Sequence, residues 1–260
     1  MDFRFYMVPG DRRLQVLDAV IRIYTERAEP VSSAAVAQAL ECRWSPATVR
    51  NIFTELEQLG WLQRPHRAAG RVPTDQGYRV FVESIVRPAS EDAAAQDWLR
   101  VELDPQELPL SELLVRAALL LSRISHALGL SQLILEPGRD AAPGGMRITG
   151  VDELLEQPEF KDPDRLRMLI HLLDDATPFG VYLRGLADSP GRVRLRIGGE
   201  NSLSELSQFS LVTARIDRAD ETAFMGLLGP VRMEYPLVLG AMESLVRLLH
   251  SRAEDKQSWS

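Results

Sequence analysis

The sequence has a single cysteine, Cys42, among its 260 residues. One cysteine can form neither an intrachain disulfide framework nor a cysteine-rich zinc site, and it fits a reducing compartment inside the cell. No uninterrupted apolar run approaches the ~20 residues that a membrane helix needs, and residues 1–10 lack the apolar core of a signal peptide. We therefore expect a cytoplasmic protein with no membrane partner.

The signatures of common catalytic and cofactor sites are also missing. The chain contains no glycine-rich phosphate loop, no dinucleotide fingerprint and no nucleophile elbow. Its four histidines are scattered without a second ligand at metal spacing, so His126 and His171 are expected to be packing or surface residues. These absences favour a protein that is not an enzyme, with no catalytic residue, cofactor or metal.

Acidic residues are in excess, and the formal net charge is −7. The excess is uneven: residues 1–87 hold 12 arginines against 10 acidic residues, while the remainder holds 18 basic against 27 acidic residues. A weakly basic N-terminal part beside an acidic remainder is a modest indication of a nucleic-acid partner. The length allows one large or two ordinary domains with a substantial core.

The N-terminal part has the pattern of a winged helix-turn-helix, which we place at residues 1–87. Apolar residues recur at spacings of three and four in its helical segments, and Ser45-Pro46 is typical of a helix start. The predicted elements are helices over 12–27, 33–40, 46–60 and 74–86, with a β-hairpin of 61–64 and 71–73 around a turn at 65–70.

After a proline-interrupted linker at 88–109, residues 110–260 predict an α+β domain with a mostly antiparallel sheet. Alternation of Val193, Leu195 and Ile197 with arginines has the period of a half-exposed strand. The predicted strands are 132–135, 146–149, 193–197, 209–216 and 222–228. The predicted helical segments are 113–128, 151–160, 164–173, a segment starting at Thr177, and 235–252.

The helix after Ser45 is the candidate DNA-reading element. Its apolar stripe leaves small and polar residues outward in the first turns, where a recognition helix contacts base edges. The Ser45 cap and the free N–H groups beside it also suit a phosphate. The candidate DNA contacts on this helix are Ser45, Ala47, Thr48, Arg50, Asn51 and Thr54. An ordinary amphipathic surface helix remains the alternative.

The predicted hairpin is basic, because no acidic residue occurs from Gln58 to Thr74. Arginines on a tip of small residues suit phosphate contacts or the minor groove. Gly70 would let the backbone approach the ligand closely. The candidate DNA contacts here are Arg64, His66, Arg67, Gly70 and Arg71. A solvated basic turn is the alternative.

An ordered series of segments resembles the HrcA family of heat-inducible transcription repressors. The series comprises Glu29–Ser33, Ser45–Asn51, Leu56–Leu62 and Pro65–Arg79, then Leu154–Phe160, Ile197–Asn201, Ser210–Ala214 and Gly229–Tyr235. The resemblance covers about residues 11–87 and 110–253. It implies a GAF-like second domain and a homodimeric repressor bound to an inverted-repeat operator upstream of chaperone genes, assisted by the GroEL chaperonin.

One departure from the family pattern concerns the middle of the chain. Family members carry a dimerising insert, whereas here only the loop 136–145 separates two predicted strands. The family's dimer contacts through the insert therefore cannot be transferred to this chain.

Several alternatives remain open from the sequence. A GAF-like domain could instead bind a small-molecule effector, or the protein could chiefly face a chaperonin. The segment Ile197–Asn201 fits a ligand-contacting loop or a tight turn. The arginines at 192, 194 and 196 fit a partner contact or a solvated strand face. Cys42 fits a small buried residue between helices or an oxidation-sensitive position beside the recognition helix.

Overall fold

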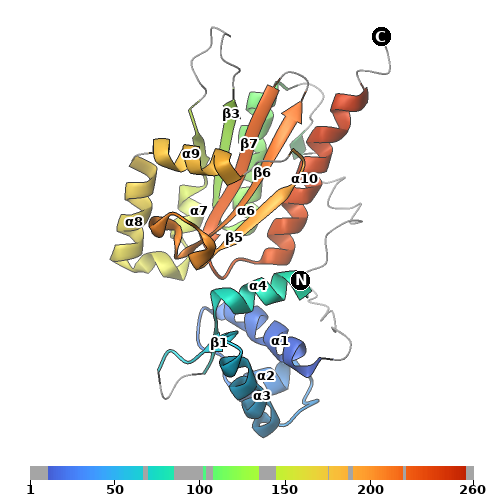
Figure 1. Cartoon of the computed structure of the whole chain (residues 1–260), viewed down its shortest axis with the longest axis vertical. Coiled ribbons are helices and arrows are strands. Elements are labelled where there is room, and N and C mark those ends of the chain that lie inside the picture. The colour runs from blue at the N-terminus through green and yellow to red at the C-terminus, as the bar shows by residue number, and fades with distance from the viewer. Residues whose placement is uncertain are drawn as a thin grey trace. The chain divides into compact units, whose positions relative to one another are not determined.

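The computed structural model describes residues 11–66, 70–84, 102–103, 108–134, 145–174, 176–186, 190–218 and 221–255. The chain divides into two compact units, Met1–Arg87 and Pro88–Ser260, and each is described by itself (Figure 1). Most of the predicted linker at 88–109 and the loop at 136–144 lie outside the described residues. Within the described ranges, no helix is both long and apolar enough to cross a membrane.

The first unit is a winged helix-turn-helix, as predicted (Figure 1). Its elements are α1 (Arg12–Arg27), α2 (Ser33–Ala39), α3 (Pro46–Gln58), β1 (Leu62–Gln63), β2 (Val72–Pro73) and α4 (Asp75–Ser84). Strands β1 and β2 pair antiparallel to form the base of the wing. Val31 adds a third, single-residue strand by an antiparallel bridge to Arg71.

Side-chain caps begin each of the four helices of this unit. Asp11, Ser32 and Ser45 accept hydrogen bonds from backbone N–H groups in the first turns of α1, α2 and α3. Thr74 caps α4 by accepting from the Gly77 N–H at 3.0 Å, and its hydroxyl also donates to the Gly60 carbonyl at 2.6 Å. These bonds satisfy N–H groups that have no partner within the helix, which explains why the sequence predicts the helix starts well.

The second unit contains a five-stranded antiparallel sheet in the order β4-β3-β7-β6-β5. Its strands are β3 (Leu128–Ile134), β4 (Arg147–Thr149), β5 (Val193–Ile197), β6 (Phe209–Arg218) and β7 (Glu221–Pro230). Its helices are α6 (Leu110–Ser125), α7 (Val151–Leu155), α8 (Pro163–Asp174), α9 (Ala176–Leu186) and α10 (Tyr235–Asp255), with short 3-10 turns at Pro158–Lys161, Gly198–Glu200 and Ser204–Leu206. The predicted α+β class with a mostly antiparallel sheet is confirmed.

Helices cover both faces of this sheet (Figure 1). On one face, α6 packs so closely on β3 that a Cβ at Gly129 would lie 2.4 Å from the Ala118 carbonyl oxygen. The Tyr235 hydroxyl, at the start of α10, lies 2.7 Å from the Ser210 hydroxyl on the same face. The opposite face carries an apolar core contributed by the sheet and by α7, α8 and α9. The sheet is therefore the middle of three layers.

One predicted boundary in this unit is wrong. The sequence predicts a helix over 113–128 followed by a strand over 132–135, but α6 ends at Ser125 and β3 begins at Leu128. His126 adopts a left-handed conformation with φ 49° and stops the helix. The apolar residues that follow suit a buried helix or a buried strand equally well, so the periodicity did not reveal the change.

Candidate nucleic-acid interface

The recognition helix α3 is oriented by its apolar side. Val49, Ile52, Phe53 and Leu56 are at most 2% exposed and hold α3 against the rest of the winged helix. The side chains of Ala47, Arg50, Asn51 and Thr54 consequently lie on the opposite, exposed side. The structure thus brings together the helix residues that the sequence singles out.

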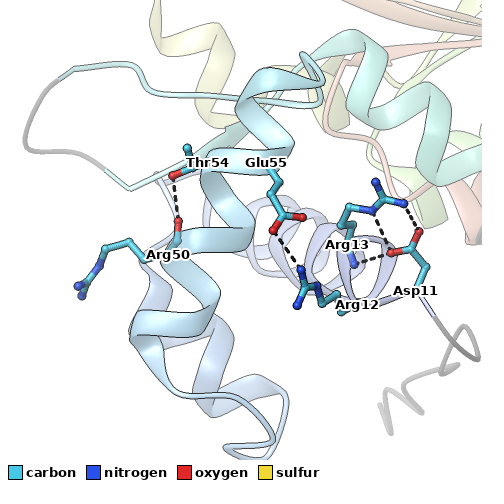
Figure 2. Close-up of polar contacts among 6 residues, drawn as sticks. All are labelled: Asp11, Arg12, Arg13, Arg50, Thr54 and Glu55. Carbon is cyan, nitrogen blue, oxygen red and sulfur yellow. Dashed lines mark hydrogen bonds and ion pairs between the residues drawn. The ribbon is translucent and has the colours of Figure 1, made fainter.

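Arg50 and Asn51 provide the guanidinium and the amide group on this exposed side of α3. Among the described residues, neither side chain has a hydrogen bond or an ion pair, and Figure 2 shows Arg50 directed away from the rest of the domain. Thr54 is different, because its hydroxyl donates to the Arg50 carbonyl at 3.2 Å. Guanidinium and amide groups without partners are suited to guanine and adenine edges, respectively.

Ser45 and Thr48 form the start of α3. Ser45 Oγ accepts from the Thr48 N–H at 3.1 Å and lies 3.0 Å from the Thr48 hydroxyl. The Ser45 side chain is therefore occupied with capping, while Thr48 is half-buried. Both residues remain at the N-terminal end of α3, where backbone N–H groups and the helix dipole favour an anion.

The start of α1 adds polar contacts that the sequence did not single out (Figure 2). Arg12 Nη2 lies 3.2 Å from Glu55 Oε1 and so links α1 to α3. Arg13 pairs with Asp11 at 2.9 Å. The hydrogen bond from Arg13 lowers the pKa of Asp11 below its ordinary value and raises that of Arg13. The Arg12–Glu55 pair thus joins the domain's N-terminal helix to the recognition helix, while the Asp11–Arg13 pair stays within the start of α1.

The turn between α2 and α3 contains a cation that the sequence analysis missed. Glu41 and Cys42 adopt left-handed conformations with φ 52° and 57°, which turns the chain sharply before α3. Arg43 then lies over the Trp44 ring, 5.5 Å from its centroid. Cys42 is exposed, so the expectation of a buried cysteine between helices is wrong. Nothing in the local sequence indicates these unusual backbone angles.

Two of the predicted wing contacts, Arg64 and His66, are exposed in the structure. His66 is exposed, and Arg64 is 44% exposed with its Nε 3.9 Å from Glu57 Oε1. Arg67, with Ala68 and Ala69, lies outside the described residues. Arg64 and His66 are therefore the described wing side chains available to a ligand.

The assignment of Arg71 as a DNA contact is corrected by the structure. Its side chain is 7% exposed, and its Nε lies 2.9 Å from Glu57 Oε1. A second nitrogen donates to Glu57 Oε2 at 3.1 Å, and the guanidinium lies 5.7 Å from the centre of the Phe53 ring. Arg71 thus attaches the wing to α3 instead of facing solvent.

Gly70 also has an internal role. A Cβ at this position would lie 2.3 Å from the Val31 carbonyl oxygen, and the neighbouring Arg71 exchanges two backbone hydrogen bonds of 2.8 Å with Val31. The absence of a side chain is therefore required by this strand contact, not by approach to a ligand as the sequence suggested.

In the second unit, side chains from the segments that resemble the HrcA family form internal hydrogen bonds and an ion pair. The buried Asn201 amide donates to the carbonyls of Gly198, Leu206 and Phe209 at 2.9–3.2 Å. Arg232 is 9% exposed and forms an ion pair with Glu159. The segment Ile197–Asn201 is accordingly a packed turn. Of the two possibilities left open by the sequence, the tight turn fits the structure.

Two protein-family models match this chain. The model described as "Winged helix-turn-helix transcription repressor, HrcA DNA-binding" covers residues 11–85. The model described as "HrcA protein C terminal domain" covers residues 105–239. Together the two models cover most of both units. The first is described as DNA-binding, and it includes the exposed side of α3.

Individual relatives give the same assignment. The heat-inducible transcription repressor HrcA of Thermosynechococcus vestitus is 28% identical over 94% of this chain and 98% of its own length. That of Nitratidesulfovibrio vulgaris is 41% identical over 51% of this chain and 37% of its own. The first alignment extends over 346 positions, more than the 260 residues of this chain, so that relative contains residues without a counterpart here.

A solved structure supports the fold across both units. A crystal structure described as that of a hypothetical protein matches with a TM-score of 0.75 at 19% identity, covering 95% of this chain and 99% of that chain. At this identity the likeness concerns the fold alone. With both family models matched and full-length relatives aligned, the chain belongs to the HrcA family of heat-inducible transcription repressors.

Proposed function

We propose that this chain represses transcription as a homodimer whose two α3 helices enter the major groove at the halves of an inverted-repeat operator. The observation that carries the proposal is the exposed side of α3, where Arg50 and Asn51 have no partner among the described residues. A two-fold dimer presents the same helix twice, so the half-sites should lie about one helical turn, ~34 Å, or a multiple apart.

The roles of the individual residues follow from their positions. Thr48, Arg50 and Asn51 read base edges, and the small Ala47 and Thr54 side chains allow α3 to approach the groove. The N-terminal end of α3 at Ser45 binds a phosphate. In the wing, Arg64, His66 and Arg67 contact phosphates or the minor groove.

The biological setting is proposed from the family. Relatives are named heat-inducible transcription repressors, and we extend this role to the present chain: a cytoplasmic repressor of chaperone genes whose activity the GroEL chaperonin assists. Electrophoretic mobility shifts with and without chaperonin test that partner. Equal operator affinity in both conditions would argue against it.

The decisive experiment is selection of operator fragments from the source genome with the purified full-length protein. Fragments retained at physiological salt should share an inverted repeat. The variant Arg50→Ala should lose this selectivity, whereas Arg167→Ala, an exposed arginine of the second unit, should retain it. Retention of unrelated sequences, or unchanged selection by Arg50→Ala, would contradict the assignment.

The effector-sensing alternative receives no support from the hollow between α9 and the sheet. This hollow contains about 240 Å³ including its open mouth, which is below the ~300–1,000 Å³ of typical ligand pockets. Among the residues that the structure describes, the buried Thr213 hydroxyl beside it has no hydrogen-bond partner. A single water molecule would satisfy that hydroxyl, so the hollow does not call for an effector.

A further inference from the structure

Three side chains able to bind a metal converge where α6 ends and α7 passes. They are His126, Glu153 and Glu156, and each has a ligand atom within 4.8 Å of those of the other two. His126 Nδ1 lies 3.1 Å from Glu153 Oε2. These residues belong to the second unit and take no part in the proposed DNA interface.

The backbone holds this cluster in place. His126 occupies the left-handed position that ends α6, and its N–H bonds to the Ser122 carbonyl. Gly150 precedes α7 with φ 72°, and a Cβ there would lie 1.6 Å from Ser122 Oγ. The start of α7 is therefore packed directly against the last turn of α6. This contact places the backbone that carries the imidazole beside the backbone that carries the two carboxylates.

The spacing within α7 places both carboxylates on one side. Glu153 lies within the helix Val151–Leu155, and Glu156 is its C-cap residue with helical backbone angles. Residues three apart along a helix are neighbours on its surface. Both carboxylates can consequently approach one ion together with the imidazole.

The local charge favours a cation. Two carboxylates share the cluster with an imidazole, and the last turn of α6 directs its carbonyl groups toward this end of the helix. Among the described residues, Glu156 has no cationic partner, and Glu153 is half-buried at 25% exposure while the side chain of His126 is 56% exposed. A bound cation would therefore offset the negative charge of the two neighbouring carboxylates.

We propose that His126, Glu153 and Glu156 form a Zn²⁺ site, with water in the remaining coordination positions. One imidazole nitrogen with two carboxylate oxygens is a ligand set that Zn²⁺ accepts, and three protein ligands leave a position open for water. Ca²⁺ and Mg²⁺ prefer ligands that are all oxygen. The imidazole nitrogen of His126 therefore favours Zn²⁺ over these two ions. The ion would connect α6 to α7 on the second unit.

Isothermal titration calorimetry with Zn²⁺ tests the site on tag-free, chelator-treated full-length protein. One ion should bind per chain. Each of His126→Gln, Glu153→Gln and Glu156→Gln should weaken binding by at least about tenfold, because each removes a ligand. The matched controls are His171→Gln on α8, an exposed histidine outside the cluster, and Glu112→Gln on α6. Both should bind Zn²⁺ like the parent.

Thermal unfolding provides a second readout that does not depend on calorimetric stoichiometry. An ion bound to the folded state should raise the Tm of the parent, and the rise should be absent in His126→Gln. Circular dichroism establishes that the variants fold. The proposal is overturned if the parent binds no Zn²⁺, or if all three ligand variants bind and respond as the parent does.

Discussion

Glu57 Oε1 lies 2.9 Å from Arg71 Nε, and this ion pair joins the recognition helix to the returning strand of the wing. Arg71 is 7% exposed and Glu57 27%. The pair is therefore partly shielded from water, with the Phe53 ring beneath the guanidinium. Its position makes it the link between the two elements that are proposed to contact DNA.

Arg71→Ala should destabilise the winged helix by about 1–3 kcal/mol. Removing one partner of a fully buried pair costs ~3–5 kcal/mol, and the exposure of Glu57 reduces this through solvent screening. Urea unfolding of the full-length protein measures the loss. Arg116→Ala breaks an exposed pair with Glu112 and should cost less than ~0.5 kcal/mol. Equal stability of both variants would show that Arg71 is not a structural link.

Asn51→Ala should weaken operator binding by about 1–3 kcal/mol and relax base preference at one position of each half-site, as expected for a base-reading residue. Fluorescence anisotropy with the selected operator and single-base variants of it measures both effects. Unchanged preference at every position would place Asn51 outside the groove.

Arg64→Ala should behave differently, because a wing arginine that contacts a phosphate carries no sequence information. Affinity should fall for all sequences alike, and the slope of log affinity against log salt should decrease by about 1. The control Arg167→Ala should leave slope and affinity unchanged. A loss confined to one sequence would instead assign Arg64 to base reading.

The sequence predicts the winged helix well because its signals are local. The serine and threonine caps, the proline at the start of α3 and the apolar stripe of that helix all act within a few residues. The exposed residues Arg50 and Asn51 follow from the same periodicity. Such features need no knowledge of what lies elsewhere in the fold.

The errors concern residues whose environment depends on distant contacts. Arg71 is indistinguishable from an exposed wing arginine until Glu57, fourteen positions earlier, is placed beside it. Gly70 suggests close approach to a ligand until Val31 is found in that space. The proposed metal ligands join His126 to residues 27 positions and more along the chain, so a search for ligands at short spacing does not consider them together.

Asn201→Ala should destabilise the second unit by about 2–3 kcal/mol, because the buried carbonyls of Leu206 and Phe209 lose the side-chain donor and that of Gly198 keeps only the bond from the backbone N–H of residue 201. The Tyr182 hydroxyl, which donates to the Asn201 side-chain oxygen at 3.2 Å, loses its acceptor as well. Urea unfolding is again the measurement. The exposed Asn51→Ala provides the same chemical change without buried partners and should alter stability by less than ~0.5 kcal/mol. Equal effects of the two would contradict the role of the Asn201 amide.

Asp18→Asn should stabilise the winged helix at neutral pH. The Asp18 side chain is 5% exposed and pairs with Arg22 at 2.7 Å, yet burial outweighs this pair and raises the pKa of Asp18 above its ordinary 3.8. The folded state consequently holds the Asp18 proton more tightly than the unfolded state does. Ionised Asp18 thus penalises folding above the raised pKa, and the penalty vanishes below the unfolded value, where both states are protonated.

The Tm difference between Asp18→Asn and the parent should therefore be near zero at low pH, grow as pH rises through the raised pKa, and reach a few degrees at neutral pH. Thermal unfolding across this range measures it. Asp164→Asn, at an aspartate whose side chain is 82% exposed, should show no such growth. If Asp18→Asn lowers the neutral-pH Tm instead, the ion pair with Arg22 contributes more than the burial of the carboxylate costs.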